Sequence, residues 1–371
     1  MSEHDAGRER PSVQTVLGPV PVADLGTTLT HEHVLVDATK FFVPDPDPLI
    51  ALELERGMVA ENLGHLKRSL VNCMDDLFMD DDAVAAHELL RFKHRGGRTV
   101  MDVTCHGIRQ RNHARRVAEI AKATRLNIIL GTGAYTQLHH PRWIGESNED
   151  ELAAVFIREL VDGVSDAMPW NPGSTETTAS AGPRCGFIGE IGIGTPMLDS
   201  ERKVLAASLT AHHATGAPLV IHQTDHDGAT RFEVLNLLES GSVDPRSVVI
   251  GHVGHLEEFD VLKKILERGV YVALDTFGLA GNWLLRELPS ELEYARRVRD
   301  ILDAGFADQL LLSHDVGHKR LLRTYGGTGF DHLSVDLPPL LEALGVDPDV
   351  LDHLMRVNPA RLFAHASAPA R

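Results

Sequence analysis

Cysteine is scarce in this chain of 371 residues, and the three that occur, Cys73, Cys105 and Cys185, form no Cys-x-x-Cys pair. Their scatter argues against a disulfide framework and favours a reducing compartment. The opening residues, MSEHDAGRERPSVQ, lack the apolar segment of a secretory signal, and no apolar run is long enough to span a bilayer. The sequence therefore predicts a cytoplasmic protein without membrane association.

Positive charge is also in short supply. The 36 Lys and Arg residues face 53 Asp and Glu, which gives a formal net charge of −17. This excess of negative charge disfavours broad attraction to nucleic acid or to anionic membranes. The composition, 43% hydrophobic and 24% charged, is common for a globular protein with a sizeable core. We expect the partner to be a small-molecule substrate.

Several catalytic motifs are absent as well. The chain contains no His-Glu-x-x-His, no Walker loop, no Gly-x-Ser-x-Gly and no Gly-x-Gly-x-x-Gly. These absences exclude a zincin protease, a P-loop nucleotide hydrolase and a serine hydrolase, and they weaken the case for a dinucleotide enzyme. The chemistry must come from a different set of side chains.

What the chain does have is a regular alternation of short apolar and longer amphipathic segments. Strands are predicted over 28–34, 98–104, 127–133, 186–193, 218–223, 247–253, 270–276 and 309–315. Helices are predicted between them, among others over 113–124, 201–215, 257–268 and 291–304. Most of the strands are continuously apolar, which is typical of parallel strands covered on both faces.

This alternation predicts an α/β fold, a (β/α)8 TIM barrel, over residues 25–365. An open doubly wound sheet is the alternative, but it would normally carry a Gly-rich turn where HEHVLVD stands. Residues 1–24 are predicted to form a tail and a short hairpin that turns at Gly18-Pro19, and 366–371 a second tail. Segments 37–97 and 170–184 are predicted to be insertions or mobile loops.

Metal-ligand side chains recur at the carboxyl ends of the predicted strands, where barrel enzymes place their active sites. They are His31, His33, Glu190, His222, His252 and Asp315. Because side chains alternate along a strand, the two histidines of THEHV point the same way and the glutamate between them points the other.

Each of these six side chains alone is more often a hydrogen-bonded core residue than a ligand. Glu190 resists that interpretation, since it stands among glycine and isoleucine, where an unpaired carboxylate is costly to bury. The other polar side chains near strand ends are expected to lie outside the group. They are His255, predicted to face elsewhere, and the loop residues His106, His226 and Asp227.

The segments THEHV, VIHQT, VIGHV, LLLSHD and VNPARLF resemble the phosphotriesterase-like family of the amidohydrolase superfamily. The resemblance implies that His31, His33 and Asp315 bind one metal ion and that His222 and His252 bind a second. Glu190 would bridge them, as in the glutamate-bridged branch, where other members use a carbamylated lysine. Two divalent ions are thus expected, with zinc first and manganese or cobalt as alternatives. The resemblance also implies a homodimer.

The reaction implied by the resemblance is hydrolysis. Two bound ions lower the pKa of a bridging water, so hydroxide is available near neutral pH, and they polarise a carbonyl or phosphoryl oxygen. Asp315 is expected to act both as a ligand and as the proton acceptor. Tyr135, in GTGAYTQ, resembles a tyrosine of lactonase members, which implies that it donates a hydrogen bond to a developing oxyanion. An aromatic ring that packs at the barrel mouth is the alternative.

The predicted substrate is therefore a lactone, ester or amide, with a lactone preferred because of Tyr135. Phosphotriester or N-acyl amide hydrolysis at the same site is the alternative, and a small-ligand binding barrel is the alternative outside the enzymes. Lys319, Arg320 and Arg323 follow the last strand and are predicted to form a lid that binds an anionic substrate group. A solvated helix face would also explain these charges.

Overall fold

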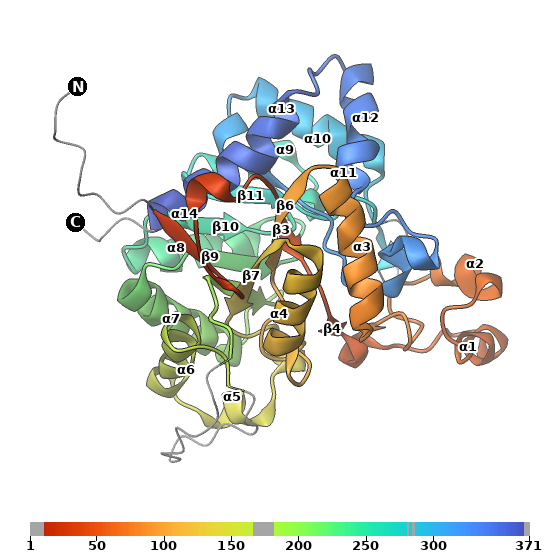
Figure 1. Cartoon of the computed structure of the whole chain (residues 1–371), viewed down its shortest axis with the longest axis horizontal. Coiled ribbons are helices and arrows are strands. Elements are labelled where there is room, and N and C mark those ends of the chain that lie inside the picture. Colours follow the sequence, from red (N-terminus) through yellow and green to blue (C-terminus); the bar gives the residue numbers. More distant parts are fainter. Residues whose placement is uncertain (1–10, 166–181, 280–281, 284–285, 367–371) are drawn as a thin grey trace.

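The structure is a computed structural model that describes residues 11–165, 182–279, 282–283 and 286–366. Its main feature is a sheet of eight strands in the order β14-β11-β10-β9-β8-β7-β6-β3, all paired in parallel (Figure 1). The Asp315 amide donates to the carbonyl of His31 at 3.1 Å, and Thr30 Oγ1 donates to the Leu312 carbonyl at 3.2 Å. These bonds join the last strand to the first and close the barrel.

All eight predicted strands are present, most of them shorter than predicted at their carboxyl ends. They are β3 (Thr27–Glu32), β6 (Gly97–Asp102), β7 (Asn127–Thr132), β8 (Phe187–Ile193), β9 (Leu219–Gln223), β10 (Val248–Ile250), β11 (Tyr271–Leu274) and β14 (Leu310–Leu312). His33, His252 and Asp315 consequently lie just beyond their strands, in the loops at the barrel mouth.

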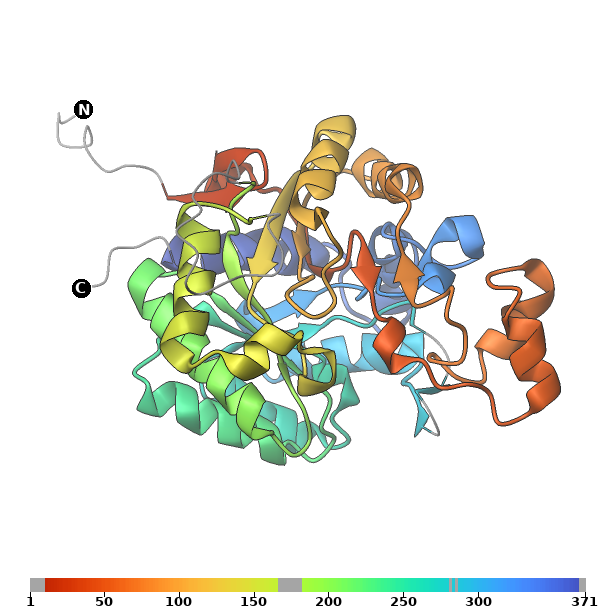
Figure 2. The same ribbon diagram turned by 90° about the horizontal axis from the view of Figure 1, so that it is seen from below.

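Helices connect successive strands and cover the outside of the barrel (Figures 1 and 2). They are α3 (Asp82–His94), α4 (His113–Thr124), α5 (Arg142–Glu146), α6 (Glu149–Val161), α7 (Asp199–Thr215), α8 (Ala229–Ser240), α9 (Phe259–Leu266) and α10 (Glu291–Asp303), followed by α11 (His332–Val335), α12 (Leu337–Ala343), α13 (Val350–Asp352) and α14 (Asn358–Ala366). Capping boxes begin two of them, with Asn148 and Glu151 on α6 and Ser290 and Glu293 on α10. None of the described helices combines the length and hydropathy needed to cross a bilayer.

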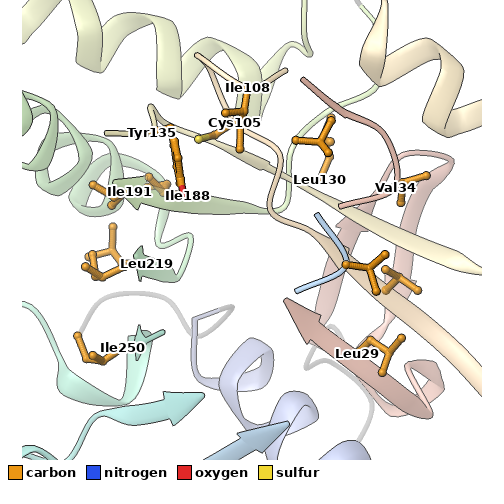
Figure 3. Packing of buried hydrophobic residues seen from close by; sticks show 14 of the residues in the cluster. Leu29, Val34, Cys105, Ile108, Leu130, Tyr135, Ile188, Ile191, Leu219 and Ile250 are labelled. Atoms are coloured by element: carbon orange, nitrogen blue, oxygen red, sulfur yellow. The ribbon is translucent and has the colours of Figure 1, made fainter. Parts of the chain in front are cut away.

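Alternate strand residues pack into two separate hydrophobic clusters. The larger cluster joins outward-facing strand residues such as Leu29, Ile188 and Leu219 to the surrounding helices (Figure 3). The smaller cluster fills the barrel interior with residues from seven of the eight barrel strands, among them Met101, Ile129, Phe187, Val220, Val249, Ala273 and Leu311. This alternation is the period of two expected of strands.

The amino-terminal end of the barrel is closed by both ends of the chain. The hairpin of β1 (Ser12–Thr15) and β2 (Gly18–Pro21) contributes Val13 to the interior cluster, and α14 contributes Leu362 and Phe363. The hairpin turns at Val16-Leu17, not at Gly18-Pro19 as predicted, because Gly18 already pairs with Thr15. Residues 1–10 and 367–371 of the predicted tails lie outside the described residues.

The predicted insertion over 37–97 holds more structure than a loop. Helix α3 belongs to the barrel, where it connects β3 to β6, so the insertion proper ends before it. The remainder carries β4 (Val36–Asp37), α1 (Pro48–Leu54), α2 (Leu63–Leu66) and β5 (Phe78–Met79), and Figures 1 and 2 both show α1 and α2 as an arm at the edge of the molecule. Most of the other predicted insertion, up to residue 181, lies outside the described residues.

Candidate metal centre

The six predicted ligand side chains meet at the carboxyl end of the barrel. Glu190 lies at the centre, with one oxygen, Oε2, 3.3 Å from His31 Nε2 and 3.0 Å from His222 Nδ1. His33 Nε2 is 3.4 Å from the other oxygen of Glu190 and 3.2 Å from Asp315 Oδ1. His252 Nε2 is 2.8 Å from His222 Nδ1 and 3.8 Å from Glu190 Oε2.

Two strand irregularities direct side chains into this group. The pairing register of β8 shifts between Ile188 and Ile191, and that of β3 shifts between Leu29 and Glu32. A bulge of this kind re-aims the side chains that follow it, because it breaks the strict alternation of faces. Glu190 therefore points inward although Ile188 and Ile191, three positions apart, both belong to the outward-facing cluster.

Two of the loop residues reach the site through an unusual backbone conformation. His252 has a φ of 53° and Asp315 a φ of 54°, both in the left-handed region that non-glycine residues rarely adopt. Such residues are held in place by their surroundings and cluster at functional sites.

A buried carboxylate that the sequence analysis did not select, Asp275, orients two of the histidines. Its Oδ1 lies 3.0 Å from His252 Nδ1, and both of its oxygens accept from the His252 amide, at 3.1 and 3.0 Å. Its Oδ2 lies 3.2 Å from His31 Nδ1. His33 is fixed in a similar way, since its Nδ1 lies 2.9 Å from the Thr104 hydroxyl. Partners of this kind set ring orientation and leave the other nitrogen for a metal.

The charges at the site shift one another's pKa values. Burial opposes ionisation of Glu190, but His222 and His31 outweigh it and hold the pKa of Glu190 well below its usual range. Burial likewise would lower the pKa of His33, but the hydrogen bond to Asp315 and the charge of Glu190 raise it to about 9. Burial and the neighbouring His252 lower the pKa of His222. Glu190 thus stays anionic at the centre of the group, while His33 binds a proton more readily than a free imidazole and His222 less readily.

The donor set fits metal ions. Both ring nitrogens of His31 are buried and face carboxylates, Nδ1 at 3.2 Å from Asp275 and Nε2 at 3.3 Å from Glu190, but neither makes a hydrogen bond of acceptable geometry, which is rare for buried polar atoms. Three overlapping triads place one ligand atom from each residue within 4.8 Å of the others, and these are His31, His252 and Asp315; His31, His33 and Glu190; and Glu190, His222 and His252. Imidazole and carboxylate suit zinc, manganese or cobalt.

A cavity of about 220 Å³ opens over these residues. His222, His252 and Asp315 line its floor, and Tyr135 lines its side with its hydroxyl 3.3 Å from His222 Nε2. The remaining described lining consists of Phe41, Thr136, Ile193, Gly194, Thr224, His226, His255, Thr276, Leu279, Leu288 and His318. Among these described lining residues there is no lysine or arginine.

Comparison with known proteins agrees with this geometry. A profile of the phosphotriesterase family matches residues 11–363. The chain belongs to the phosphotriesterase family. Similar to it is the N-acetyltaurine hydrolase of Rattus norvegicus, which is 31% identical over 353 residues that cover 94% of this chain and 96% of the relative.

Two solved structures share the fold of this chain. A resiniferatoxin-binding protein from Rhodobacter sphaeroides has a TM-score of 0.86 and 28% identity, with 95% of each chain covered. A lactonase from Listeria monocytogenes has a TM-score of 0.74 and 22% identity, with 95% of this chain and 98% of that chain covered, and it supports the fold. The predicted resemblance and the TIM-barrel fold are confirmed, and the family marks the chain as a hydrolase.

Two predicted substrate contacts of this phosphotriesterase-family chain lie away from the cavity. Lys319 Nζ pairs with Asp75 Oδ1 at 2.5 Å, and Arg323 Nε pairs with Asp331 Oδ1 at 2.9 Å. Neither residue is part of the described lining. The basic segment after β14 binds acidic groups of the protein itself, so the structure does not bring these two cations to an anionic substrate group.

Two histidines that the sequence analysis left outside the group do line the cavity. His255 follows His252 by three residues, and its ring centre lies 6.0 Å from that of His252. His226 Nδ1 lies 2.7 Å from the His255 carbonyl, which holds the two loops together. The only sequence signal for either residue was proximity to a strand end. His106, by contrast, lies 3.0 Å from Glu159 and is not part of the described lining.

Proposed function

We propose that this member of the phosphotriesterase family is a binuclear metal-dependent hydrolase that attacks the carbonyl of a small substrate. The observation that carries the proposal is the convergence of six ligand side chains, from five different strands or their ends, on one place, where three of them, His222, His252 and Asp315, line the cavity. His31, His33 and Asp315 would hold one ion, His222 and His252 the other, and Glu190 would lie between them. When bound, the ions, zinc by preference, supply a water of lowered pKa and polarise the carbonyl.

Asp315 is the proposed proton acceptor. Burial would raise the pKa of Asp315, but its hydrogen bond to His33 and the charge of His31 outweigh it and hold the pKa well below the ordinary range. The carboxylate is therefore ionised at neutral pH and lines the cavity, where it can accept a proton and pass it to a leaving group.

Tyr135 is the proposed hydrogen-bond donor to the oxyanion. Burial, followed by the charges of Glu190 and Asp315, raises the pKa of Tyr135 well above its ordinary value. The phenol therefore keeps its proton. A neutral donor on the cavity wall next to His222 can stabilise negative charge that develops on the carbonyl oxygen.

The cavity walls support a compact and largely apolar substrate. Phe41, Ile193, Leu279 and Leu288 supply the apolar surface, and no lysine or arginine stands among the described lining residues. We propose a lactone first, because of the phenol of Tyr135. An N-acyl amide is the second candidate, and what favours it is the 31% identity to the N-acetyltaurine hydrolase across nearly the whole chain.

The test is a substrate panel with protein that has been stripped of metal and reloaded with zinc, manganese or cobalt. Lactones, N-acyl amides, esters and phosphotriesters would be compared by kcat/KM, and metal content would be measured by elemental analysis. We expect about two equivalents of metal per chain and hydrolysis of a carbonyl substrate. A chain that binds no metal after reloading would instead be a ligand-binding barrel.

Two further expectations belong with this proposal. We propose a homodimer, as is frequent among relatives that the sequence resembles, and light scattering coupled to gel filtration would test it. We also propose that the protein works in the cytoplasm, which its three free and buried cysteines support. Fractionation of the source cells with an antibody against the chain would test the compartment.

A further inference from the structure

Glu32 stands between the two ligand histidines of β3, and its fully buried side chain faces the loop that follows β14. Its Oε1 accepts from the His314 amide at 3.0 Å and from the Ser313 hydroxyl at 2.8 Å. Its Oε2 accepts from the Val316 amide at 3.0 Å. The two backbone donors are the residues on either side of Asp315.

Asp315 needs such support. Its φ of 54° lies in the left-handed region, which costs an aspartate free energy that contacts with the surrounding structure must offset. The Asp315 amide donates to the carbonyl of His31 at 3.1 Å, so this amide and both of its neighbours are bonded to residues 31 and 32. One short stretch of β3 therefore fixes the backbone from which the Asp315 carboxylate projects.

We propose that Glu32 is the positioning residue of Asp315: it holds the backbone on both sides of that residue so that the carboxylate meets His31 and His33. The inference rests on the proposed function, in which Asp315 is ligand and proton acceptor. Glu32 itself is not among the described residues that line the cavity. Its effect would pass entirely through the 3.7 Å and 3.2 Å contacts that Asp315 Oδ1 makes with His31 and His33.

A second carboxylate provides a matched control. Glu88 is also fully buried, and it also accepts from two backbone amides of the segment after β14, those of Arg323 at 3.0 Å and Thr324 at 2.8 Å. It accepts from the Thr324 hydroxyl at 2.7 Å as well. Glu88 therefore matches Glu32 in accepting from two backbone amides and a hydroxyl, but it lacks an imidazole contact like the 2.7 Å one between Glu32 Oε1 and His314 Nδ1, and the backbone it holds flanks no candidate ligand.

The experiment compares Glu32→Gln with Glu88→Gln in the full chain loaded with zinc. The amide keeps the size of the side chain but turns one acceptor into a donor that faces a backbone N–H or a hydroxyl. For Glu32→Gln we expect zinc affinity, measured by chelator competition, to fall roughly 10- to 100-fold for one of the two ions. We expect kcat to fall with little change in KM. Glu88→Gln should lower the melting temperature but leave zinc affinity and kcat near wild type.

Equal zinc affinity and equal kcat in the two variants would overturn the positioning role. If Glu32→Gln does not fold, Glu32→Asp replaces it in the test, because the shorter carboxylate cannot reach both flanking amides. An intermediate loss of zinc affinity in Glu32→Asp supports the positioning role, and wild-type zinc affinity overturns it. Failure of the proposed function has a different signature, since the wild-type chain would then bind no zinc or hydrolyse nothing in the panel.

Discussion

Asp315 differs from the other five candidate ligands in the solvent exposure of its side chain. It is 23% exposed, whereas His222, the next most exposed of the six, is 10% exposed. A carboxylate in this position can both contact an ion and exchange a proton with a bound molecule. A substitution that keeps the shape of the Asp315 side chain should therefore test proton transfer without disturbing the fold.

Replacing Asp315 by asparagine is expected to leave the fold intact and to lower kcat by roughly 100-fold or more, the usual contribution of a positioned proton acceptor. The amide keeps the shape of the side chain but cannot take up the proton. Circular dichroism would check the fold, and kcat on the best panel substrate the activity. A variant with full kcat would remove Asp315 from proton transfer.

Tyr135→Phe should lower kcat by about 10- to 100-fold with a smaller change in KM, because the hydroxyl acts mainly when charge develops on the carbonyl oxygen. Phe41, which packs edge-on against the Tyr135 ring at 6.0 Å between centres, offers a control on the same wall. Phe41→Leu should change KM more than kcat. A larger effect on KM in Tyr135→Phe, together with a larger effect on kcat in Phe41→Leu, would contradict the assigned roles.

The sequence predicted some of these residues far better than others. His31, Glu190 and Asp315 could be found because the carboxyl ends of barrel strands meet at one place, whatever the intervening chain does. Asp275 also ends a predicted strand, in VALDT, but a single aspartate there carries no signal of the two histidines it would orient. Lys319 and Arg323 were misleading because the acidic residues that bind them, Asp75 and Asp331, come from chain segments whose packing no local pattern reveals.

At the scale of elements, the arm that carries α1 and α2 is joined to the loop after β14 through a buried carboxylate. Asp76 accepts from Arg320 Nε at 2.6 Å and from the Arg320 amide at 2.7 Å, and it lies 3.2 Å from His318 Nδ1. His318 and Phe41, which precedes α1, both line the cavity. The segment between β3 and α3 thus contributes Phe41 to the cavity wall, and through Asp76 it binds the loop that contributes His318.

Asp76→Asn is expected to destabilise the protein by about 3 kcal/mol at pH 7, because it leaves the Arg320 guanidinium without its buried anion. Burial would raise the pKa of Asp76, but His318 and Arg320 outweigh it and lower the pKa below the ordinary 3.8. The stabilisation is therefore complete above pH 3.8 and is lost as pH falls through the lower, folded-state pKa.

Melting temperatures of the wild type and Asp76→Asn, measured from pH 7 to pH 3, would check this. The gap between them should stay constant down to about pH 4 and narrow below it. Asp75→Asn is the control, since the Asp75 side chain is 42% exposed and its ion pair should contribute little. A gap that widens in acid would contradict the assignment.

The order of elements was easier to predict than their limits. Eight apolar segments separated by amphipathic ones leave few arrangements other than a barrel, and all eight strands were found. The strands end earlier than predicted because residues such as His252 turn into left-handed conformations, which apolar patterning does not reveal. The sequence predicts the arm only as part of an insertion or mobile loop, because α1 and α2 are too short, at seven and four residues, to show helical periodicity.

For the whole molecule, the candidate metal centre lies where five strands or their ends meet. Metal binding at this place should stabilise the native barrel and not the unfolded chain, since the ligands come from positions far apart in sequence. Removing metal with a chelator is expected to lower the melting temperature. Adding free zinc at about 100 times its dissociation constant should raise the free energy of unfolding by about 2.7 kcal/mol. Calorimetry with and without chelator would measure this, and an unchanged melting temperature would count against metal binding.

Both ends of the described chain lie at the face of the barrel opposite the metal centre. Ser12 and Ala366 border the same hollow there, and the hairpin bonds to the first residues of β7 through the Val16 amide and the Ile128 carbonyl. An affinity tag or a surface tether at either terminus would therefore leave the mouth turned toward the solution. Immobilised protein should keep its access to substrate whichever end is anchored.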